Sequence, residues 1–125
     1  MSLSPDNFVM SQVALLAWQD GHKEGHNAMV AIMFVIANRV RAKWEDGNWL
    51  AVVQSLRRTG RGSNEYPDAR DPGFQQLLTD VDAVYDGAED ILTDGALYYF
   101  APQNMLDPGP TTPPVAKIGN LSFFR

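Results

Sequence analysis

The stretch of sequence that decides the fold spans residues 18–40 and reads WQDGHKEGHNAMVAIMFVIANRV. Its first half is broken by glycines and histidines and carries two carboxylates, Asp20 and Glu24. Its second half is a long apolar run that closes in NRV at residues 38–40. An apolar surface this wide predicts the central, buried helix of a mainly helical fold, with both acids in the turn that precedes it.

The position of Asp20 favours acid chemistry. With Gly21 it marks the expected end of a first helix, because glycine takes the left-handed conformation that closes helices. An acid at a helix C-terminus meets the negative end of the macrodipole, and shielding by Trp18 or Phe34 would further disfavour its charged form. A carboxyl that stays protonated near neutral pH can donate its proton to the oxygen of a leaving sugar. The alternative is a solvated aspartate at a helix end and a surface Glu24, and the spacing alone leaves both interpretations open.

Four helices are expected along the chain, each with its own start or stop signal. The first is mostly apolar over residues 8–18, and the second is the central helix described above. The residues that mark helix ends are the Ser4-Pro5-Asp6 start and Asp20-Gly21 stop of the first, the caps Asn27 and Asn48 of the second and third, and the Pro72 start and Gly87 stop of the fourth.

Two later runs have the character of strands. Residues 96–100 and 121–124 are expected to pair as a small antiparallel ribbon, and alternation along the first should turn one of Tyr98 and Tyr99 outward. The proline-rich residues 102–114 between them are predicted to form a loop. With 125 residues, of which 45% are apolar, the chain is expected to form one domain with a real core. The predicted fold class is mainly α, with a small antiparallel β ribbon.

Composition excludes several classes of function. The net charge of −5 argues against a nucleic-acid binder or a binder of anionic membranes, since such binding rests on basic surface. The chain has no cysteine, which excludes a thiolate nucleophile, a disulfide framework and cysteine-ligated zinc. No signal peptide precedes Phe8, and no apolar run approaches the length of a membrane span. We therefore expect no membrane insertion, and the sequence leaves the oligomeric state open.

The histidines and arginines do not predict a site of their own. His22 and His26 are four residues apart, but Lys23 stands where a zinc-binding HExxH motif needs glutamate. We therefore expect a surface pair of histidines, no metal and no cofactor. The basic residues 57–62 are expected to form a solvated loop whose charges balance nearby acids, with contact to an anionic glycan as the alternative.

Four motifs, in order along the chain, resemble those of the SleB-like cell-wall hydrolases, the spore-cortex-lytic and phage-lysin family. Residues 18–40 are similar to the opening W-x-E-A-R-G-E motif of that family, with its spacer and its apolar helix ending V-I-x-N-R-V. DPGF at residues 71–74 resembles the family's D-P-x-F helix start. DGALYYFAP at residues 94–102 is similar to its G-A-T-H-Y-F-A-P element, and IGNLSFF at residues 118–124 to its closing I-G-x-H-x-F-Y.

The resemblance implies a lysozyme-like fold and a muramidase or lytic transglycosylase, which cleaves the β-1,4 bond between N-acetylmuramic acid and N-acetylglucosamine in peptidoglycan. Counting back from Asn38, the family's catalytic glutamate falls on Asp20 and its second glutamate falls on Glu24. Asp20 would act as general acid and then as base toward the muramoyl 6-hydroxyl, giving an anhydro product. With Glu24 as a true partner, hydrolysis by two carboxylates is the alternative. The side chains expected to contact the glycan strand are Asn38, Tyr66, Tyr98, Tyr99 and Gln103.

The chain also departs from the family pattern. Asp20 is one methylene shorter than glutamate, which sets its carboxyl back by about 1.5 Å. Leu97 and Tyr98 replace the family's threonine and histidine, and Leu121 replaces its late histidine. A second interpretation is therefore a catalytically degenerate peptidoglycan-binding or phage structural protein on the same scaffold. In either case the protein would be made in the cytoplasm and act at the cell wall after release by a holin, after export by a partner, or as part of a phage particle.

Overall fold

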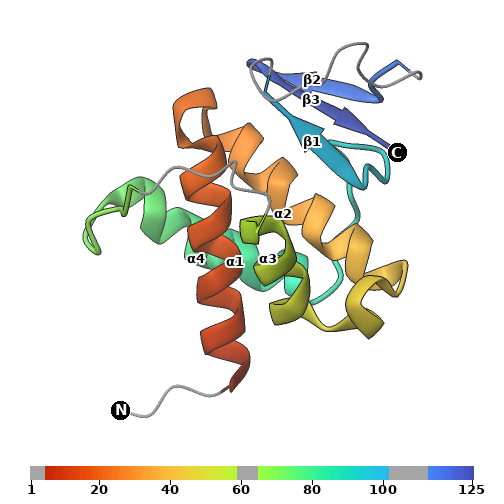
Figure 1. The fold of residues 1–125 in the computed structure, drawn as a ribbon. Coiled ribbons are helices and arrows are strands. Elements are labelled where there is room, and N and C mark those ends of the chain that lie inside the picture. The colour runs from red at the N-terminus through yellow and green to blue at the C-terminus, as the bar shows by residue number, and fades with distance from the viewer. Residues whose placement is uncertain (1–4, 59–64, 102–112) are drawn as a thin grey trace.

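The computed structural model describes residues 5–58, 65–101 and 113–125. Within these ranges the chain is mainly helical and carries a small antiparallel sheet, as the sequence predicts (Figure 1). The elements are α1 (Pro5–Gly21), η1 (His22–Glu24), α2 (His26–Arg41), η2 (Trp44–Gly47), α3 (Trp49–Arg58), α4 (Pro72–Tyr85), β1 (Tyr98–Phe100), β2 (Ala116–Ile118) and β3 (Leu121–Phe124). No helix in the described part of the chain is both long enough and apolar enough to cross a membrane.

Helix α2 forms the centre of the helical layer. Residues 31–37 are all buried, and α1, α3 and α4 each pack against this helix. A helix that is apolar on every side must be covered on every side, which explains the arrangement of the other three around it. Full burial of a side chain such as Ile32 or Ile36 stabilises the fold by about 2 kcal/mol relative to leaving it exposed.

The turn between α1 and α2 differs from the sequence prediction in two details. Helix α1 does end at Gly21, but the φ of this residue is −126°, so the glycine is not left-handed. It is required instead for close packing, because a Cβ there would lie 2.9 Å from Ile32 Cδ1 and 3.2 Å from the backbone nitrogen of Met29. The N-cap of α2 is Gly25, with φ +101°, and not Asn27. The chain reverses at Gly25, which leaves Asn27 exposed inside the first turn.

The ends of the other two helices match the sequence signals. The Oδ1 atom of Asn48 accepts the backbone N–H of Ala51 at 2.9 Å, which confirms Asn48 as the cap of α3. Helix α4 begins at Pro72 as predicted, and Asp71 just before it accepts a backbone N–H of the first turn. Its C-terminus is closed at Gly87, whose N–H donates to the carbonyl oxygen of Val84, the last residue but one of the helix.

The sheet has the order β1-β3-β2 with both pairings antiparallel. The predicted pairing of β1 with β3 is confirmed, with Tyr99 opposite Phe123. The alternation is also confirmed, because Tyr99 is buried whereas 38% of Tyr98 is exposed. Strand β2 was not predicted from the sequence.

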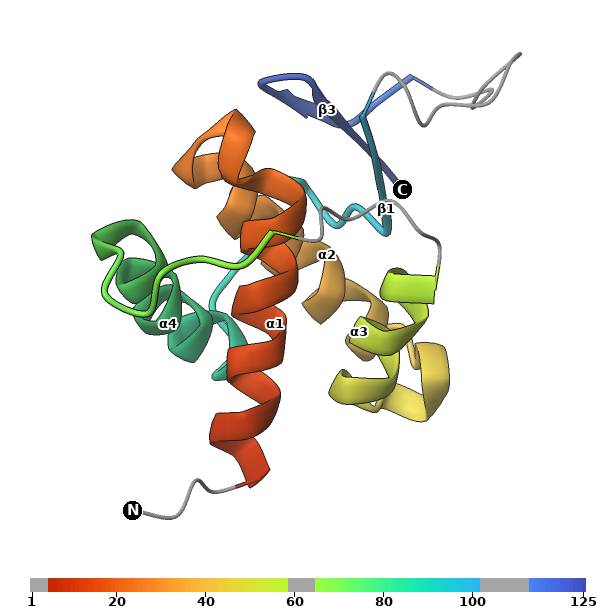
Figure 2. The same cartoon turned by 60° about the vertical axis from the view of Figure 1, so that its left-hand side comes forward.

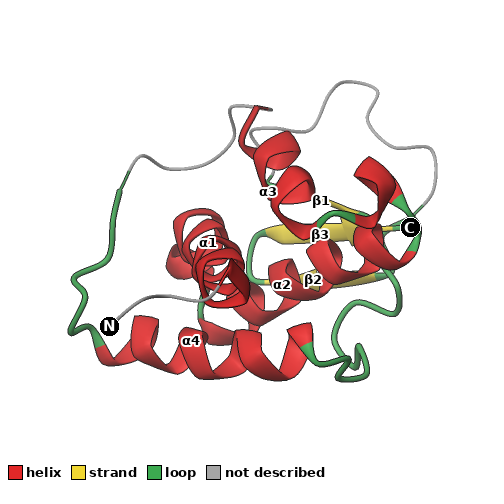
Figure 3. Cartoon of the chain, turned by 90° about the horizontal axis from the view of Figure 1, so that it is seen from below, coloured by secondary structure: helices red, strands yellow, loops and turns green. Residues whose placement is uncertain are grey.

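The sheet lies over the corner at which α1 ends and α2 begins (Figures 1 and 2). Seen from the opposite end of the molecule, the strands lie behind the helices (Figure 3). Tyr99 and Phe123, with ring centroids 6.2 Å apart, belong to the sheet face that joins the hydrophobic core. The corner between α1 and α2 is therefore the place where helical layer and sheet meet.

The two asparagines considered as caps give a matched test. Replacing Asn48 by alanine should lower the free energy of unfolding by about 1 kcal/mol, because the first turn of α3 loses its side-chain acceptor. Replacing Asn27 by alanine should leave it nearly unchanged, because that side chain lies exposed within α2. Urea denaturation of both variants measures the difference. An equal loss in the free energy of unfolding for Asn27→Ala and Asn48→Ala would contradict the assigned caps.

Candidate active site

Asp20 lies in the last turn of α1, partly buried at the junction with the sheet. The hydroxyl of Tyr99, on β1, donates a hydrogen bond to Asp20 Oδ2. The other carboxylate oxygen of Asp20 is also shielded from solvent. Only 4% of Tyr99 is exposed. This residue was expected to contact the glycan, but it is buried and bonds Asp20 instead.

A polar network next to Asp20 was missed by sequence reasoning. The buried side chain of Gln19 donates to the carbonyl oxygen of Glu65 at 3.0 Å and accepts from Arg57 Nη1 at 2.6 Å. The prediction of a solvated basic loop is therefore wrong for Arg57, which lies in α3 and binds α1; residues 59–62 lie outside the described residues. Because the partners are 38 and 46 residues from Gln19, no local pattern could have indicated the contact.

Glu24 lies in η1 and fastens the turn between β2 and β3. Its Oε2 accepts the backbone N–H of Asn120 at 2.8 Å, and its Oε1 is 3.4 Å from Asn120 Nδ2. The preceding Gly119 has φ +58° and lies so close that a Cβ would overlap Glu24 Oε2. The carboxylate is thus engaged in joining the sheet to the helical corner.

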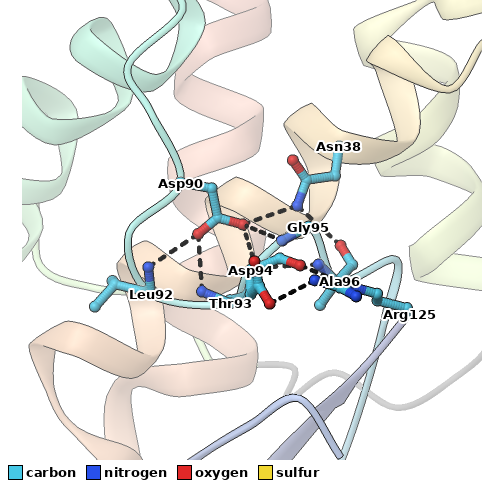
Figure 4. Close-up of polar contacts among 8 residues, drawn as sticks. All are labelled: Asn38, Asp90, Leu92, Thr93, Asp94, Gly95, Ala96 and Arg125. Carbon is cyan, nitrogen blue, oxygen red and sulfur yellow. Dashed lines mark hydrogen bonds and ion pairs between the residues drawn. The ribbon is translucent and has the colours of Figure 1, made fainter.

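Asn38, expected to contact the glycan, is engaged by the connection between α4 and β1. Its Nδ2 donates to Asp90 Oδ2 and to the carbonyl oxygen of Ala96, both at 3.0 Å (Figure 4). The same carboxylate of Asp90 accepts the backbone N–H groups of Leu92, Thr93 and Gly95 and the hydroxyl of Thr93. The cluster around Asp90 therefore fixes the start of β1 against α2.

This concentration of donors changes the protonation of Asp90. Burial alone would raise the pKa of its carboxyl. The hydrogen bonds from Thr93, Asn38 and the backbone N–H of Gly95 outweigh burial and hold the pKa below its ordinary value. Asp90 is therefore an ionised structural acid and a poor proton donor, which distinguishes it from the role expected of Asp20.

The remaining predicted contact residues are more exposed. The side chain of Tyr66 is 73% exposed and follows Glu65 directly. The rings of Tyr98 and Trp44 pack edge to face, with their centroids 5.5 Å apart. The guanidinium carbon of the buried Arg39 lies 4.4 Å from the centroid of the Trp44 ring. Gln103 lies outside the described residues.

The two histidines lie in different environments. His22 stacks on Trp18 with ring centroids 3.9 Å apart and only 20% of its side chain is exposed, so it is partly buried where a surface histidine was predicted. His26 is more exposed and its Nε2 lies 3.0 Å from Asp80 Oδ2 on α4. Over residues 5–58, 65–101 and 113–125, no three His, Cys, Asp or Glu side chains are grouped so that they could hold a metal ion.

No protein-family model, curated protein or solved structure matches the chain. The functional interpretation therefore rests on the residues and contacts described above, together with the motif resemblance.

The Asp90 cluster predicts a pH-dependent stability. Asp90→Asn should lower the free energy of unfolding at neutral pH by about 1–3 kcal/mol, since several mostly part-buried donors lose a charged acceptor. A carboxyl whose pKa is lowered by folding stabilises the fold above its unfolded-chain pKa, about 3.9, and loses this effect as the pH falls through the folded value. The deficit of the variant should therefore shrink in acid, as measured by urea denaturation over a pH series.

Asp94→Asn is the matched control for that series. The Asp94 carboxylate is exposed and paired with Arg125, so its loss should cost less than about 1 kcal/mol. An equal cost at both positions, or a deficit at Asp90 that persists in strong acid, would contradict the assigned role of Asp90.

The contact of Glu24 with Gly119 predicts an energetic coupling. Gly119→Ala should lower the free energy of unfolding by about 2–4 kcal/mol, because the methyl group meets the Glu24 carboxylate and the residue is left-handed. In a Glu24→Ala background the same change should cost less, about 1–2 kcal/mol. The strain of a left-handed alanine and the close approach to the Cβ and carbonyl oxygen of residue 24 remain there, but the overlap with the carboxylate is gone. A double-mutant cycle measures the difference, and additive effects would show that Glu24 does not clamp this turn.

Proposed function

We propose that the chain is a peptidoglycan-cleaving glycosidase on a lysozyme-like scaffold, with Asp20 as its general acid. The observation that carries this proposal is the placement of Asp20. It is partly buried at the C-terminus of α1 and held by the Tyr99 hydroxyl where helices and sheet meet. A carboxyl fixed in this way is oriented before substrate arrives, which general acid catalysis requires.

Within this class, the state of Glu24 favours a lytic transglycosylase. Hydrolysis by two carboxylates requires a second acid that can reach the sugar or a water molecule. Glu24 instead accepts hydrogen bonds from Asn120, whereas Asp20 is the acid at the end of α1. A mechanism with a single acid needs no partner of this kind.

The proposed reaction uses Asp20 twice. Its carboxyl donates a proton to the glycosidic oxygen as the bond from muramoyl C1 to that oxygen breaks, which releases the N-acetylglucosamine end as an alcohol. The resulting carboxylate then accepts the proton of the muramoyl 6-hydroxyl while O6 bonds to C1. The products are a 1,6-anhydromuramoyl end and a free hydroxyl, with Asp20 protonated again.

Tyr99 is proposed as the positioning residue for this acid. Its hydroxyl donates a hydrogen bond to Asp20 Oδ2, which fixes the orientation of the carboxyl. The exposed ring of Tyr66 and the partly exposed ring of Tyr98 supply apolar faces of the kind on which pyranose rings pack. We propose these two rings as contacts for the glycan strand.

A second candidate function is glycan binding without catalysis. It is favoured by the number of expected site residues that are occupied by structural bonds, since Glu24, Asn38 and Tyr99 each bond another part of the fold. Such a protein would use the exposed aromatic rings and act at the cell wall after release or as a component of a phage particle.

Digestion of purified peptidoglycan, with products identified by mass spectrometry, tests the enzyme proposal. The wild type should release anhydromuramoyl products, and Asp20→Asn should reduce the rate at least a hundredfold because the proton donor is lost. Tyr99→Phe should reduce it about tenfold or more, through a loosened carboxyl. Glu24→Gln should retain product formation if it folds, because Glu24 has no chemical step.

Tyr85→Phe is the matched control for Tyr99→Phe. Tyr85 also donates its hydroxyl to an aspartate, Asp6, but it joins α4 to α1 at the opposite end of α1. Its loss should leave the cleavage rate unchanged. If the wild type instead releases products with reducing ends, and Glu24→Gln abolishes them, hydrolysis by two carboxylates replaces the single-acid mechanism. Glycan binding by a folded wild type without any cleavage would establish the second candidate.

A further inference from the structure

Glu65 is anchored to the corner between α1 and α2 at three points. Its carbonyl oxygen accepts from Gln19 Nε2 at 3.0 Å. Its carboxylate oxygens lie 3.2 Å from His22 Nε2 and 3.5 Å from Lys23 Nζ. Glu65 leads directly into the exposed Tyr66. The backbone that leads into Tyr66, the proposed sugar contact, is therefore attached to Gln19 and His22, which lie on either side of Asp20 in the sequence.

The contacts of His22 fix which form of its ring fits this arrangement. Its Nδ1 lies 2.8 Å from the carbonyl oxygen of Trp18, and its Nε2 faces the Glu65 carboxylate. Both neighbours can only accept hydrogen bonds. A neutral imidazole has one N–H and satisfies one of them, whereas the imidazolium donates to both. The stack on Trp18 holds the ring in the plane that reaches both acceptors.

We infer that protonated His22 is a positioning residue that holds the Glu65–Tyr66 segment beside Asp20, so that affinity for the glycan strand depends on the charge of His22. This inference rests on the proposed function, since it assigns Tyr66 to the glycan. Loss of the proton leaves two acceptors competing for one N–H and weakens the attraction of His22 to Glu65. The segment that carries Tyr66 is then held less firmly, by Gln19 and Lys23 alone.

The other charged groups near His22 have partners of their own. Lys23 shares the Glu65 carboxylate, and it keeps part of the attachment when His22 is neutral. Asp20 bonds Tyr99, and Glu24 bonds Asn120. On the facing helix α3, Arg57 bonds Gln19. His22 and Glu65 are therefore the two groups whose opposite charges face each other across this contact. Because the Glu65 side chain is 52% exposed, we expect an effect of about threefold to tenfold on affinity.

The experiment follows structure and binding over one pH series. NMR spectra report the protonation of His22 and the signals of Tyr66. Calorimetry gives the Kd for a peptide-free tetrasaccharide of alternating N-acetylglucosamine and N-acetylmuramic acid, in an Asp20→Asn background that prevents turnover. His22→Gln and Glu65→Gln each remove one side of the contact. His26→Gln is the matched control, since His26 faces Asp80 on α4.

The Tyr66 signals should shift with the same midpoint as His22, and the Kd should rise about threefold to tenfold as His22 loses its proton. The pH dependence of the Tyr66 signals and that of the Kd should vanish in His22→Gln and Glu65→Gln, and both should persist in His26→Gln. Tyr66 signals that ignore the His22 titration, or equal Kd values for the parent and both variants across the series, would overturn the inference. Tyr66 signals that follow His22 in a protein that binds no tetrasaccharide at any pH would uphold the contact and overturn the proposed function.

Discussion

The close approach of α1 and α2 at Gly21 is the constraint on which the rest of the structure depends. There is no room for a Cβ between this residue and Ile32, so the backbone of α1 at Gly21 packs directly against α2. The chain must then reverse within the short element η1 and the left-handed Gly25. This tight corner directs the side chains on either side of Gly21 toward different parts of the molecule.

Three side chains of the corner each bind a different segment. Asp20 bonds β1 through Tyr99, His22 faces Glu65, and Glu24 bonds the turn between β2 and β3. A sheet of three strands, each of three or four residues, needs support from other elements. Carboxylates that accept hydrogen bonds from the sheet supply part of it, since bonds to charged groups contribute about 1.5–3 kcal/mol each. The same acids that resemble a catalytic motif therefore also hold the fold together.

Local patterns were sufficient to predict the helices and one strand pair. The apolar run of α2 and the helix-end signals at Asn48, Pro72 and Gly87 are patterns of residues that are close in sequence. These signals were identified correctly. Strand β2 has only Ala116, Lys117 and Ile118, with a single β-branched residue, so it carried too little signal. The prediction of a cap at Asn27 was wrong because the chain already reverses at Gly25, two residues earlier, so Asn27 lies inside the helix.

The contacts of the candidate site lay beyond such reasoning, because their partners are distant in sequence. Tyr99 is 79 residues from Asp20, and Asp90 is 52 residues from Asn38. The sequence patterns predicted that Asn38 and Tyr99 contact a glycan, but in the structure both side chains bond other parts of the fold. For Asp90, the Thr93 and Asp94-Gly95 positions that follow it were a turn signal that could have suggested a carboxylate collecting local N–H groups.

The contact between Asp20 and Tyr99 also gives a physical reason for the shorter acid. A glutamate at position 20 would place its carboxyl about 1.5 Å further along the side chain, into the space of the buried Tyr99 hydroxyl. Tyr99 is held by the sheet and packs on Phe123, so it cannot retreat without moving β1. The length of the acid and the position of the tyrosine are therefore matched. Whatever reach Asp20 has toward a ligand is set by the register of β1 on β3, which in turn depends on the corner that Gly21 closes.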